Sequence, residues 1–333
     1  VIMAFLMECF QRGYLTTEDA GGLELKWGDE ALALAFIHQV AEGKTELAAA
    51  AGRGMLAVVE FVARAFAART GQPEPLAELR RFAMQTKGLP FSLYRTHRSL
   101  SMQASYAAAS DIGAHHAAAW LIKVDLLGAF PSMEDKARAL LTYPRVRLGN
   151  DNLGLCKLPW VDVFNPESGT RKNTDIYINP ASQELYADFY NGMLGTNMTW
   201  QEIFAQTDRD INLQRVMNAM VFGADTGGRD VLPDRAIGPT DDRLYEAEAA
   251  FNDGETARLV GRRLEEVRTL PTPRKREILM NARKKQLQDL ISTYYRERGW
   301  TDAGIPTVAT LKGLGLWPFL SEEARTKISA LAA

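Results

Sequence analysis

Apolar residues at helical spacing run through most of this sequence, and they constrain its fold more than any other feature. Two segments, residues 28–42 and 54–68, place apolar side chains at intervals of four. The apolar positions are Leu32, Phe36 and Val40 in the first segment and Val58, Val62 and Phe66 in the second. Side chains with this spacing lie on one face of an α-helix, so both segments are predicted to be amphipathic helices.

The stretch from Arg274 to Arg298 shows the same pattern over a greater length. Gly299 follows it and is a typical C-terminal stop. Its apolar stripe consists of Leu287, Leu290, Ile291 and Tyr294, with Lys and Arg opposite. Strand patterns are few: short extended pieces are predicted near Trp160–Phe164 and Asp175–Ile178, and neither has a clear partner. We therefore predict a mainly α-helical fold.

Turn-forming residues divide the chain into two parts. Gly and Pro stand at Gly88-Leu89-Pro90, and Pro, Gly, Ser and Asn cluster at residues 165–179. A chain of 333 residues is long enough for two domains. We place the boundary near residue 87, which gives helical domains at 1–87 and 88–333. The polar loop at 165–179 either covers a site or is a surface connection.

The first predicted domain begins abruptly. Val1–Phe10 already lies inside an apolar helical pattern, with no N-cap residue before it. We therefore expect this domain to be incomplete at its N-terminal side and the chain to be a part of a longer polypeptide or one half of a split enzyme.

Composition excludes several classes of protein. The chain is 46% apolar with a formal net charge of −2, and no run approaches the roughly 18–20 uncharged apolar residues that a membrane span needs. Its near-neutral charge gives no field of a single sign that would attract nucleic acid. The locally basic segment Arg274–Lys285 is interpreted as a solvated helix face. We predict neither a membrane span nor nucleic-acid binding.

Cysteine usage indicates a reducing compartment. Cys9 and Cys156 are the two cysteines of the chain, too few for a disulfide framework. The N-terminus lacks the basic segment and the small-residue cleavage site of a secretory signal peptide. We therefore expect a cytoplasmic protein.

The hexapeptide Asp151-Asn152-Leu153-Gly154-Leu155-Cys156 combines three residue types that suit a cofactor. Gly154 permits a tight loop whose backbone can approach a bulky ligand. The Asp151 carboxylate can accept hydrogen bonds from an amino-substituted heterocycle, and the Cys156 thiolate can bind iron. A lone intracellular cysteine is more often a small buried hydrophobic residue, so the hexapeptide needs support from the rest of the chain.

Three further segments provide that support. The hexapeptide resembles the Asp-x-x-Gly-Leu-Cys motif of the tungsten-containing aldehyde:ferredoxin oxidoreductase family. The other segments resemble landmarks of the same family in the same order: Glu8–Thr16, Leu25–Asp29, and Tyr294–Trp300 with Gly304–Thr307. The resemblance covers essentially the whole chain, and it implies the C-terminal, α-helical part of such an enzyme without the sheet-rich, N-terminal pterin-binding domain.

The resemblance also implies roles for the hexapeptide. Asp151, Gly154 and Leu155 would contact a tungsten or molybdenum bis-pterin, and Cys156 would be a ligand of a [4Fe-4S] cluster. Cys9 falls where the family has an ordinary helix residue. A [4Fe-4S] cluster takes four thiolates, so both cofactors would need the missing N-terminal part of the enzyme.

A histidine pair precedes the hexapeptide. Gly113-Ala114-His115-His116 matches a Gly-x-x-His pattern of the family, in which the histidine lies beside the tungsten. The resemblance implies a catalytic role for His116 in preference to His115, because an imidazole can donate a hydrogen bond and transfer a proton near neutral pH. The alternative is a histidine in the core bonded to a backbone carbonyl.

One segment departs from the family pattern. Tyr94-Arg95-Thr96-His97-Arg98-Ser99 stands where the aldehyde-oxidising enzymes tend to have Tyr-Asp-Pro-Arg-Gly. Its basic residues could meet an anionic group or belong to a solvated loop. This departure, the pair His115-His116, and Pro233–Pro239 ahead of a long helical segment resemble the tungsten subunit of the ATP-independent benzoyl-CoA reductases.

The resemblance implies oxidation of aldehydes to carboxylic acids, with ferredoxin or an iron-sulfur subunit as the electron acceptor. The benzoyl-CoA reductase branch implies instead an aromatic acyl-CoA substrate and reduction of its ring. A third reading is a non-catalytic helical scaffold or interaction module.

Overall fold

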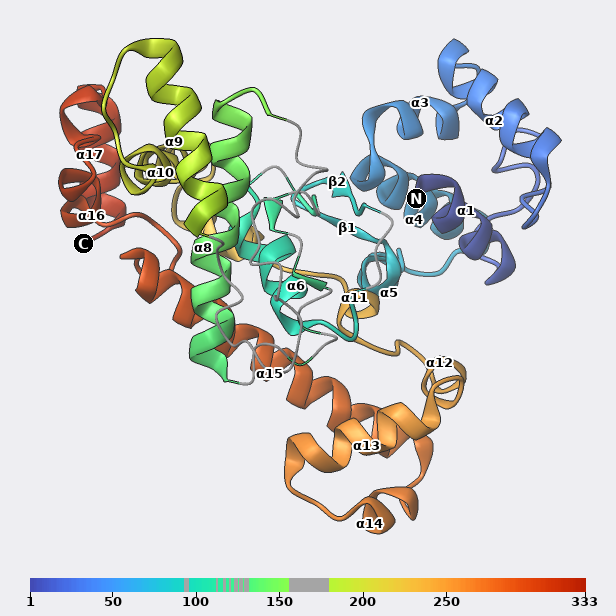
Figure 1. The fold of residues 1–333 in the computed structure, drawn as a ribbon. Helices are drawn as coiled ribbons and strands as arrows, with labels where there is room; N and C mark the ends of the chain where they lie inside the picture. The colour runs from blue at the N-terminus through green and yellow to red at the C-terminus, as the bar shows by residue number, and fades with distance from the viewer. Residues whose placement is uncertain are drawn as a thin grey trace. The chain divides into compact units, whose positions relative to one another are not determined.

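The computed structural model describes residues 1–92, 96–111, 113–115, 118, 119, 121, 122, 125, 128, 132–155 and 180–333, except for the side chains of 180–183. This part of the chain is mainly helical, as the sequence predicts, and its one sheet is a two-stranded hairpin (Figure 1). No helix in the described ranges is long and apolar enough to traverse a lipid bilayer. The extended pieces predicted at 160–164 and 175–178 and the loop at 165–179 lie outside the described residues.

The chain forms two compact units. Unit 1 comprises Val1–His97, Ile112–Ala114 and Leu232–Lys284, and unit 2 comprises Arg98–Asp111, His115–Val231 and Lys285–Ala333. Residues 232–284 therefore belong with the N-terminal part of the chain, which is a different division from a single cut near residue 87. The assignment of domains to 1–87 and 88–333 stays a prediction.

Unit 1 is built from short and medium helices. Its elements are α1 (Ile2–Gln11), α2 (Glu30–Glu42), α3 (Glu46–Arg53), α4 (Met55–Thr70), α5 (Leu76–Phe82), β1 (Gln85–Thr86), β2 (Leu89–Pro90), α11 (Asp234–Ile237), α12 (Asp242–Glu246), α13 (Ala249–Val260), α14 (Leu264–Arg268) and the first half of α15 (Thr272–Arg298). Its apolar core gathers side chains from α1 to α5, and within it the rings of Phe5 and Phe82 lie 5.3 Å apart.

The predicted helices at 28–42 and 54–68 are confirmed as α2 and α4. Leu32 and Phe36 of α2 are buried, as are Val58 and Val62 of α4. The Asp29 side chain accepts a hydrogen bond from the backbone N–H of Leu32 at 2.9 Å, which satisfies one of the free donors at the start of α2.

The Gly88 turn signal marks a hairpin. Lys87 and Gly88 connect β1 to β2, and both have positive φ, 54° and 86°. Two left-handed residues form the type of turn whose twist suits a two-residue hairpin. The hairpin places Leu89 and Thr86 opposite each other in unit 1.

Unit 2 contains the longest helices of the chain. Its elements are α6 (Leu100–Ala104), the π-helical turn η1 (Ser105–Ala109), α8 (Met133–Asn152), α9 (Pro180–Leu194), α10 (Trp200–Phe222), the 3₁₀ turns η4 (Gly223–Asp225) and η5 (Gly227–Arg229), the second half of α15, α16 (Val308–Gly313), η6 (Trp317–Phe319) and α17 (Glu322–Leu331). The helix predicted at 274–298 is confirmed as α15, and all four residues of its apolar stripe are buried.

The closing segment of the chain packs on α10 through polar contacts. Arg215 is fully buried; its Nη2 lies 2.6 Å from Asp230 Oδ2, and its Nε donates to the Gly304 carbonyl at 2.7 Å. The indole N–H of Trp300 donates to Asn212 Oδ1 at 2.8 Å. Buried polar groups need such partners, so this network holds the C-terminal segment that contains Trp300 and Gly304 against α10.

The basic segment Arg274–Lys285 is only partly solvated, which corrects the interpretation as a solvated face. Lys275 and Arg283 are buried; Lys275 Nζ lies 3.0 Å from Asp253, and Arg283 Nη2 lies 3.2 Å from Glu255. Burial lowers the pKa of Arg283, and the neighbouring Glu255 opposes this shift. The buried charges of Lys275 and Arg283 are therefore paired with carboxylates of α13.

Candidate functional site

The segment Asp151–Leu155 forms the end of α8. The N–H of Gly154 donates to the Asp151 carbonyl at 3.0 Å, and the N–H of Leu155 donates to the Asn150 carbonyl at 2.8 Å. Gly154 has φ +70°, and no atom lies within 4 Å of the place where its Cβ would be. These bonds define a Schellman C-cap, which needs a left-handed residue at the Gly154 position. The glycine of the motif is therefore required by the helix end itself.

The C-cap presents acceptor groups to its surroundings. Asp151 is exposed in the last turn of α8, where the helix dipole is negative. The neighbouring Asn152 donates to Asp210 at 2.5 Å, and Leu155 is also exposed. The exposed carboxylate of Asp151 can accept hydrogen bonds from N–H donors.

Packing against α10 holds this end of α8 in place. A Cβ at Gly149 would lie 2.3 Å from the ring of Phe204, so α10 approaches α8 at the turn before Asp151 (Figure 1). Arg147 is buried in the same turn, and burial lowers its pKa to about 10, while Tyr186, Tyr143 and Asp151 act in the opposite direction. The C-terminal end of α8 is thus supported by close packing against α10.

Cys156 and His116, the predicted cluster ligand and the predicted catalytic histidine, lie outside the described residues. His115 is described and exposed. The roles of these residues, and those of Asp151, Gly154 and Leu155 toward a cofactor, stay predictions.

Gly113, which begins the Gly-x-x-His segment, has a clear structural requirement. Its φ is +93°, and a Cβ there would lie 2.9 Å from Leu89 Cβ and 3.3 Å from the Thr86 carbonyl. The next residue, Ala114, accepts a hydrogen bond from the N–H of Ser92 at 3.1 Å. The segment that leads to the histidine pair is therefore fixed against the β1–β2 hairpin.

We expect Gly113→Ala to lower the free energy of unfolding by roughly 2–4 kcal/mol, because it adds a steric conflict with Leu89, about 1–3 kcal/mol, to the cost of a left-handed backbone, about 1 kcal/mol. Urea denaturation at neutral pH measures the loss. Gly154→Ala is the matched control: Gly154 also has a positive φ but open space around its Cβ position, so the substitution should cost about 1 kcal/mol. Equal losses for the two variants would contradict the importance of the close approach.

Cys9 is a buried core residue. It belongs to the apolar cluster of unit 1, and burial, followed by the negative charge of Glu8, raises its pKa well above the usual range. A thiol in this setting is protonated at neutral pH and is not a ready metal ligand. Its position agrees with the sequence-based view that Cys9 does not bind the cluster.

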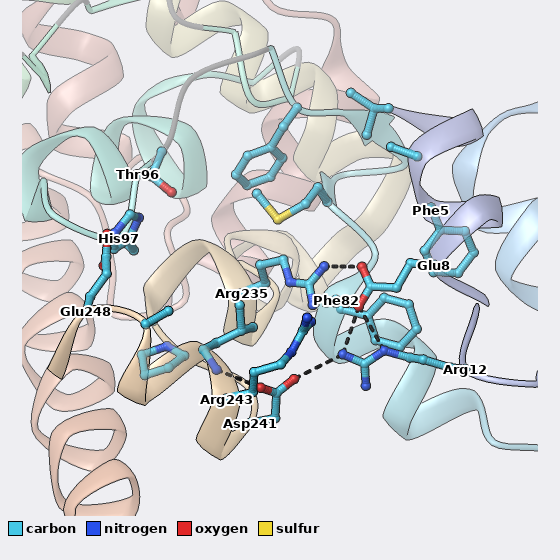
Figure 2. A pocket seen from close by; sticks show the side chains of 18 of the residues that line it. Phe5, Glu8, Arg12, Phe82, Thr96, His97, Arg235, Asp241, Arg243 and Glu248 are labelled. Carbon is cyan, nitrogen blue, oxygen red and sulfur yellow. Dashed lines mark hydrogen bonds and ion pairs between the residues drawn. The ribbon is translucent and has the colours of Figure 1, made fainter. Parts of the chain in front are cut away.

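A second feature is a cavity of about 1140 Å³ in unit 1. No pattern in the sequence predicts it. Its walls come from residues 1–12, Trp27, residues 82–92, Thr96, His97 and residues 235–252, and Figure 2 draws 18 of the side chains that line it, with ten of them labelled. Aromatic rings of Phe5, Phe82, Phe91 and Trp27 form apolar parts of the wall.

Glu8 is the centre of the ion pairs on one side of this cavity. Its Oε1 accepts from Arg12 Nε at 2.8 Å and from Arg235 Nη2 at 2.7 Å, and Arg12 Nη2 also lies 3.2 Å from Asp241 (Figure 2). Burial alone would raise the pKa of Glu8, but the two guanidinium groups outweigh it and hold the pKa below its ordinary value of 4.5. Glu8 is therefore ionised at neutral pH.

The segment Tyr94–Ser99, which departs from the family pattern, contributes Thr96 and His97 to the wall of this cavity. Tyr94 and Arg95 are outside the described residues. Thr96 is buried and donates to the Ala236 carbonyl at 2.7 Å, and His97 Nε2 lies 2.9 Å from Glu248. His97 thus meets a carboxylate of the chain itself.

No three His, Cys, Asp or Glu side chains in the described part of the chain come together as a metal site. The cavity belongs to unit 1, and the Asp151–Leu155 segment belongs to unit 2.

Comparison with known proteins places the chain in a family. The family model described as "Aldehyde ferredoxin oxidoreductase, domains 2 & 3" matches residues 1–316. No curated protein matches the sequence. One similar solved structure is described as "Active site complex BamBC of Benzoyl Coenzyme A reductase in complex with 1,5 Dienoyl-CoA", with a TM-score of 0.54 and 14% identity. The match covers 95% of this chain and 43% of that one, so the chain spans less than half the length of its structural neighbour.

Proposed function

Because the chain belongs to the aldehyde ferredoxin oxidoreductase family, of which it represents domains 2 and 3, we propose that it forms the helical part of a tungsten (or molybdenum) bis-pterin oxidoreductase. The family match over residues 1–316 supports this proposal most strongly. The reaction we propose is the oxidation of an aldehyde to a carboxylic acid, with ferredoxin or an iron-sulfur subunit as electron acceptor.

The described residues of the Asp-x-x-Gly-Leu-Cys motif, Asp151–Leu155 at the end of α8, are suited to contact one side of the cofactors. Asp151 offers an exposed carboxylate at the acceptor end of a helix, and the Schellman turn leaves the space beside Gly154 open. Asp151 would accept hydrogen bonds from the pterin, Gly154 and Leu155 would lie against it, and Cys156 would supply one thiolate to the [4Fe-4S] cluster. The tungsten–pterin group would supply the two-electron redox chemistry, and the cluster would pass the electrons on singly.

The remaining ligands must come from another polypeptide segment. Besides Cys156 the chain contains Cys9, which is buried in the core of unit 1. A [4Fe-4S] cluster takes four thiolates, so one loop of this chain cannot complete it. We propose that the N-terminal half of the same enzyme provides the other three.

The chain's own catalytic contribution is assigned to His116. Its imidazole would orient the substrate carbonyl by donating a hydrogen bond and would hold or release a proton at a ring nitrogen. The segment before it is fixed by Gly113 against the hairpin, which is a favourable arrangement for a positioned side chain.

A benzoyl-CoA reductase is the second candidate, because the similar solved structure carries that description. Its title names a dienoyl-CoA, so an aromatic acyl-CoA would replace the aldehyde as substrate. At 14% identity the likeness concerns the fold, and the proposal for aldehydes therefore stands first.

Activity assays of the complete enzyme distinguish these functions. We expect an aldehyde to reduce ferredoxin in its presence, and benzoyl-CoA with a low-potential electron donor to give no cyclic diene. The opposite pattern would favour the acyl-CoA branch. A protein with neither activity and without metal would be a helical scaffold, the third candidate.

A further inference from the structure

The second half of α10 exposes apolar side chains where the first half exposes polar ones. In the first half, the exposed polar side chains are those of Gln201, Glu202, Gln206 and Arg209. From residue 211 to residue 222, the exposed side chains are all apolar, and they are Leu213, Met217, Val221 and Phe222. A surface helix normally turns its polar face to water, so the second half of α10 departs from the pattern of a solvated helix.

Three of these side chains form a continuous stripe, which we call the α10 stripe. Leu213, Met217 and Val221 are spaced four residues apart, so they lie on one face of the helix. They are 39%, 61% and 71% exposed. Phe222 is not part of the stripe, because the guanidinium of Arg229 lies 3.8 Å from the centroid of its ring. Single exposed apolar residues are common, but a contiguous row of them marks an interaction surface.

The other faces of this part of α10 are packed within unit 2. Val216 and Ala219 belong to an apolar core that includes Ile305 and Leu311 of the closing segment. Along its length α10 also packs against α8, α9 and α17 (Figure 1). The α10 stripe is the apolar face that these helices leave exposed.

The α10 stripe begins beside the Asp-x-x-Gly-Leu-Cys motif. Asn152 Nδ2 donates to Asp210 Oδ2 at 2.5 Å. Asp210 stands three residues before Leu213, so the motif contacts the same face of α10 that carries the stripe. Leu155, which directly precedes Cys156 in the sequence, is 43% exposed. The motif and the stripe therefore occupy neighbouring parts of the surface of unit 2.

A [4Fe-4S] cluster at Cys156 requires another polypeptide segment at this place. The cluster takes four thiolates, and Cys156 would supply one of them. The segment with the other three must lie against the motif, so it also meets the start of the α10 stripe. Such a segment stays bound, and permanent interfaces are more apolar than those of partners that bind and leave. An electron acceptor dissociates after each transfer and fits an apolar stripe less well, and a second copy of the chain would not need to dock beside the motif.

We propose that the α10 stripe is the docking surface for the polypeptide segment that carries the other three cluster thiolates. Apolar side chains of that segment cover Leu213, Met217 and Val221, and its thiolates reach the cluster beside Leu155. The inference rests on the proposed function, because it takes Cys156 as a cluster ligand.

Alkylation of an introduced thiol by N-ethylmaleimide, measured by mass spectrometry, tests this docking surface. Met217→Cys should react rapidly in the chain made alone and at least about tenfold more slowly in the complete enzyme, because a covered thiol is inaccessible to the reagent. Met193→Cys is the matched control: Met193 is 83% exposed on α9, so this variant should react rapidly in both preparations. Cys9, which is buried, is the internal reference for a protected thiol.

Three outcomes overturn the proposal. The first is an equal rate for Met217→Cys in the chain alone and in the complete enzyme. The second is protection in the chain alone that increases with its concentration, which would identify a second copy as the occupant. The third is protection that appears only when the electron acceptor is added.

Iron analysis of the same complete enzyme separates this inference from the proposed function. Four irons together with an unprotected Met217→Cys overturns the docking surface alone. Absence of iron contradicts the proposed function and, with it, this inference. Four irons with a protected Met217→Cys is the result we expect.

Discussion

Replacing His116 by alanine in the complete enzyme should lower the turnover of aldehyde by a factor on the order of 10² to 10⁴, with the tungsten content unchanged. The reason is that a positioned imidazole contributes hydrogen bonding and proton transfer in the transition state, while the metal is held by other groups. Steady-state kinetics and metal analysis on the same preparation measure both quantities.

His115→Ala is the matched control for this variant. His115 is exposed, and the resemblance to the family assigns the catalytic position to its neighbour. If His115→Ala has the larger effect on turnover, the choice within the pair is wrong. If neither substitution lowers turnover, the better explanation is that His116 is a structural residue of the core.

Replacing Cys156 by serine in the complete enzyme should lower its iron content or change the EPR spectrum of its cluster. A serine oxygen binds iron less well than a thiolate and shifts the potential of the cluster. Iron analysis and EPR spectroscopy of the reduced enzyme check this result.

The second cysteine supplies the control. Cys9→Ala removes a buried thiol from the core of unit 1, so it should reduce stability modestly while leaving iron and spectrum unchanged. Alanine is the better choice here, because serine would bury a hydroxyl group in an apolar cluster. Wild-type iron content and an unchanged spectrum in Cys156→Ser would contradict its assignment as a ligand.

The helices could be predicted because their signals are local. Leu287, Leu290 and Ile291 recur on one face of α15, and burial of that face follows from the same spacing. The Gly154 turn is local in the same way, since both hydrogen bonds of the C-cap lie within the six residues from Asn150 to Leu155. Family resemblance then supplied the cofactor roles, which no periodicity in the sequence could have given.

The cavity could not be predicted because its contacts join distant parts of the chain. Glu8 binds Arg235, which is 227 residues away, and Arg12 binds Asp241, which is 229 residues away. Neither pair leaves a pattern in the sequence around either partner. The same applies to Lys275 and Arg283, whose carboxylate partners on α13 cannot be inferred from a basic segment alone.

Tungsten and iron should be measured by elemental analysis in the chain made alone and in the complete enzyme. We expect no stoichiometric metal in residues 1–333 alone, because one available thiolate cannot hold the cluster, and we expect tungsten with four irons in the complete enzyme. Stoichiometric tungsten and iron in the chain alone, or no metal in the complete enzyme, would contradict it.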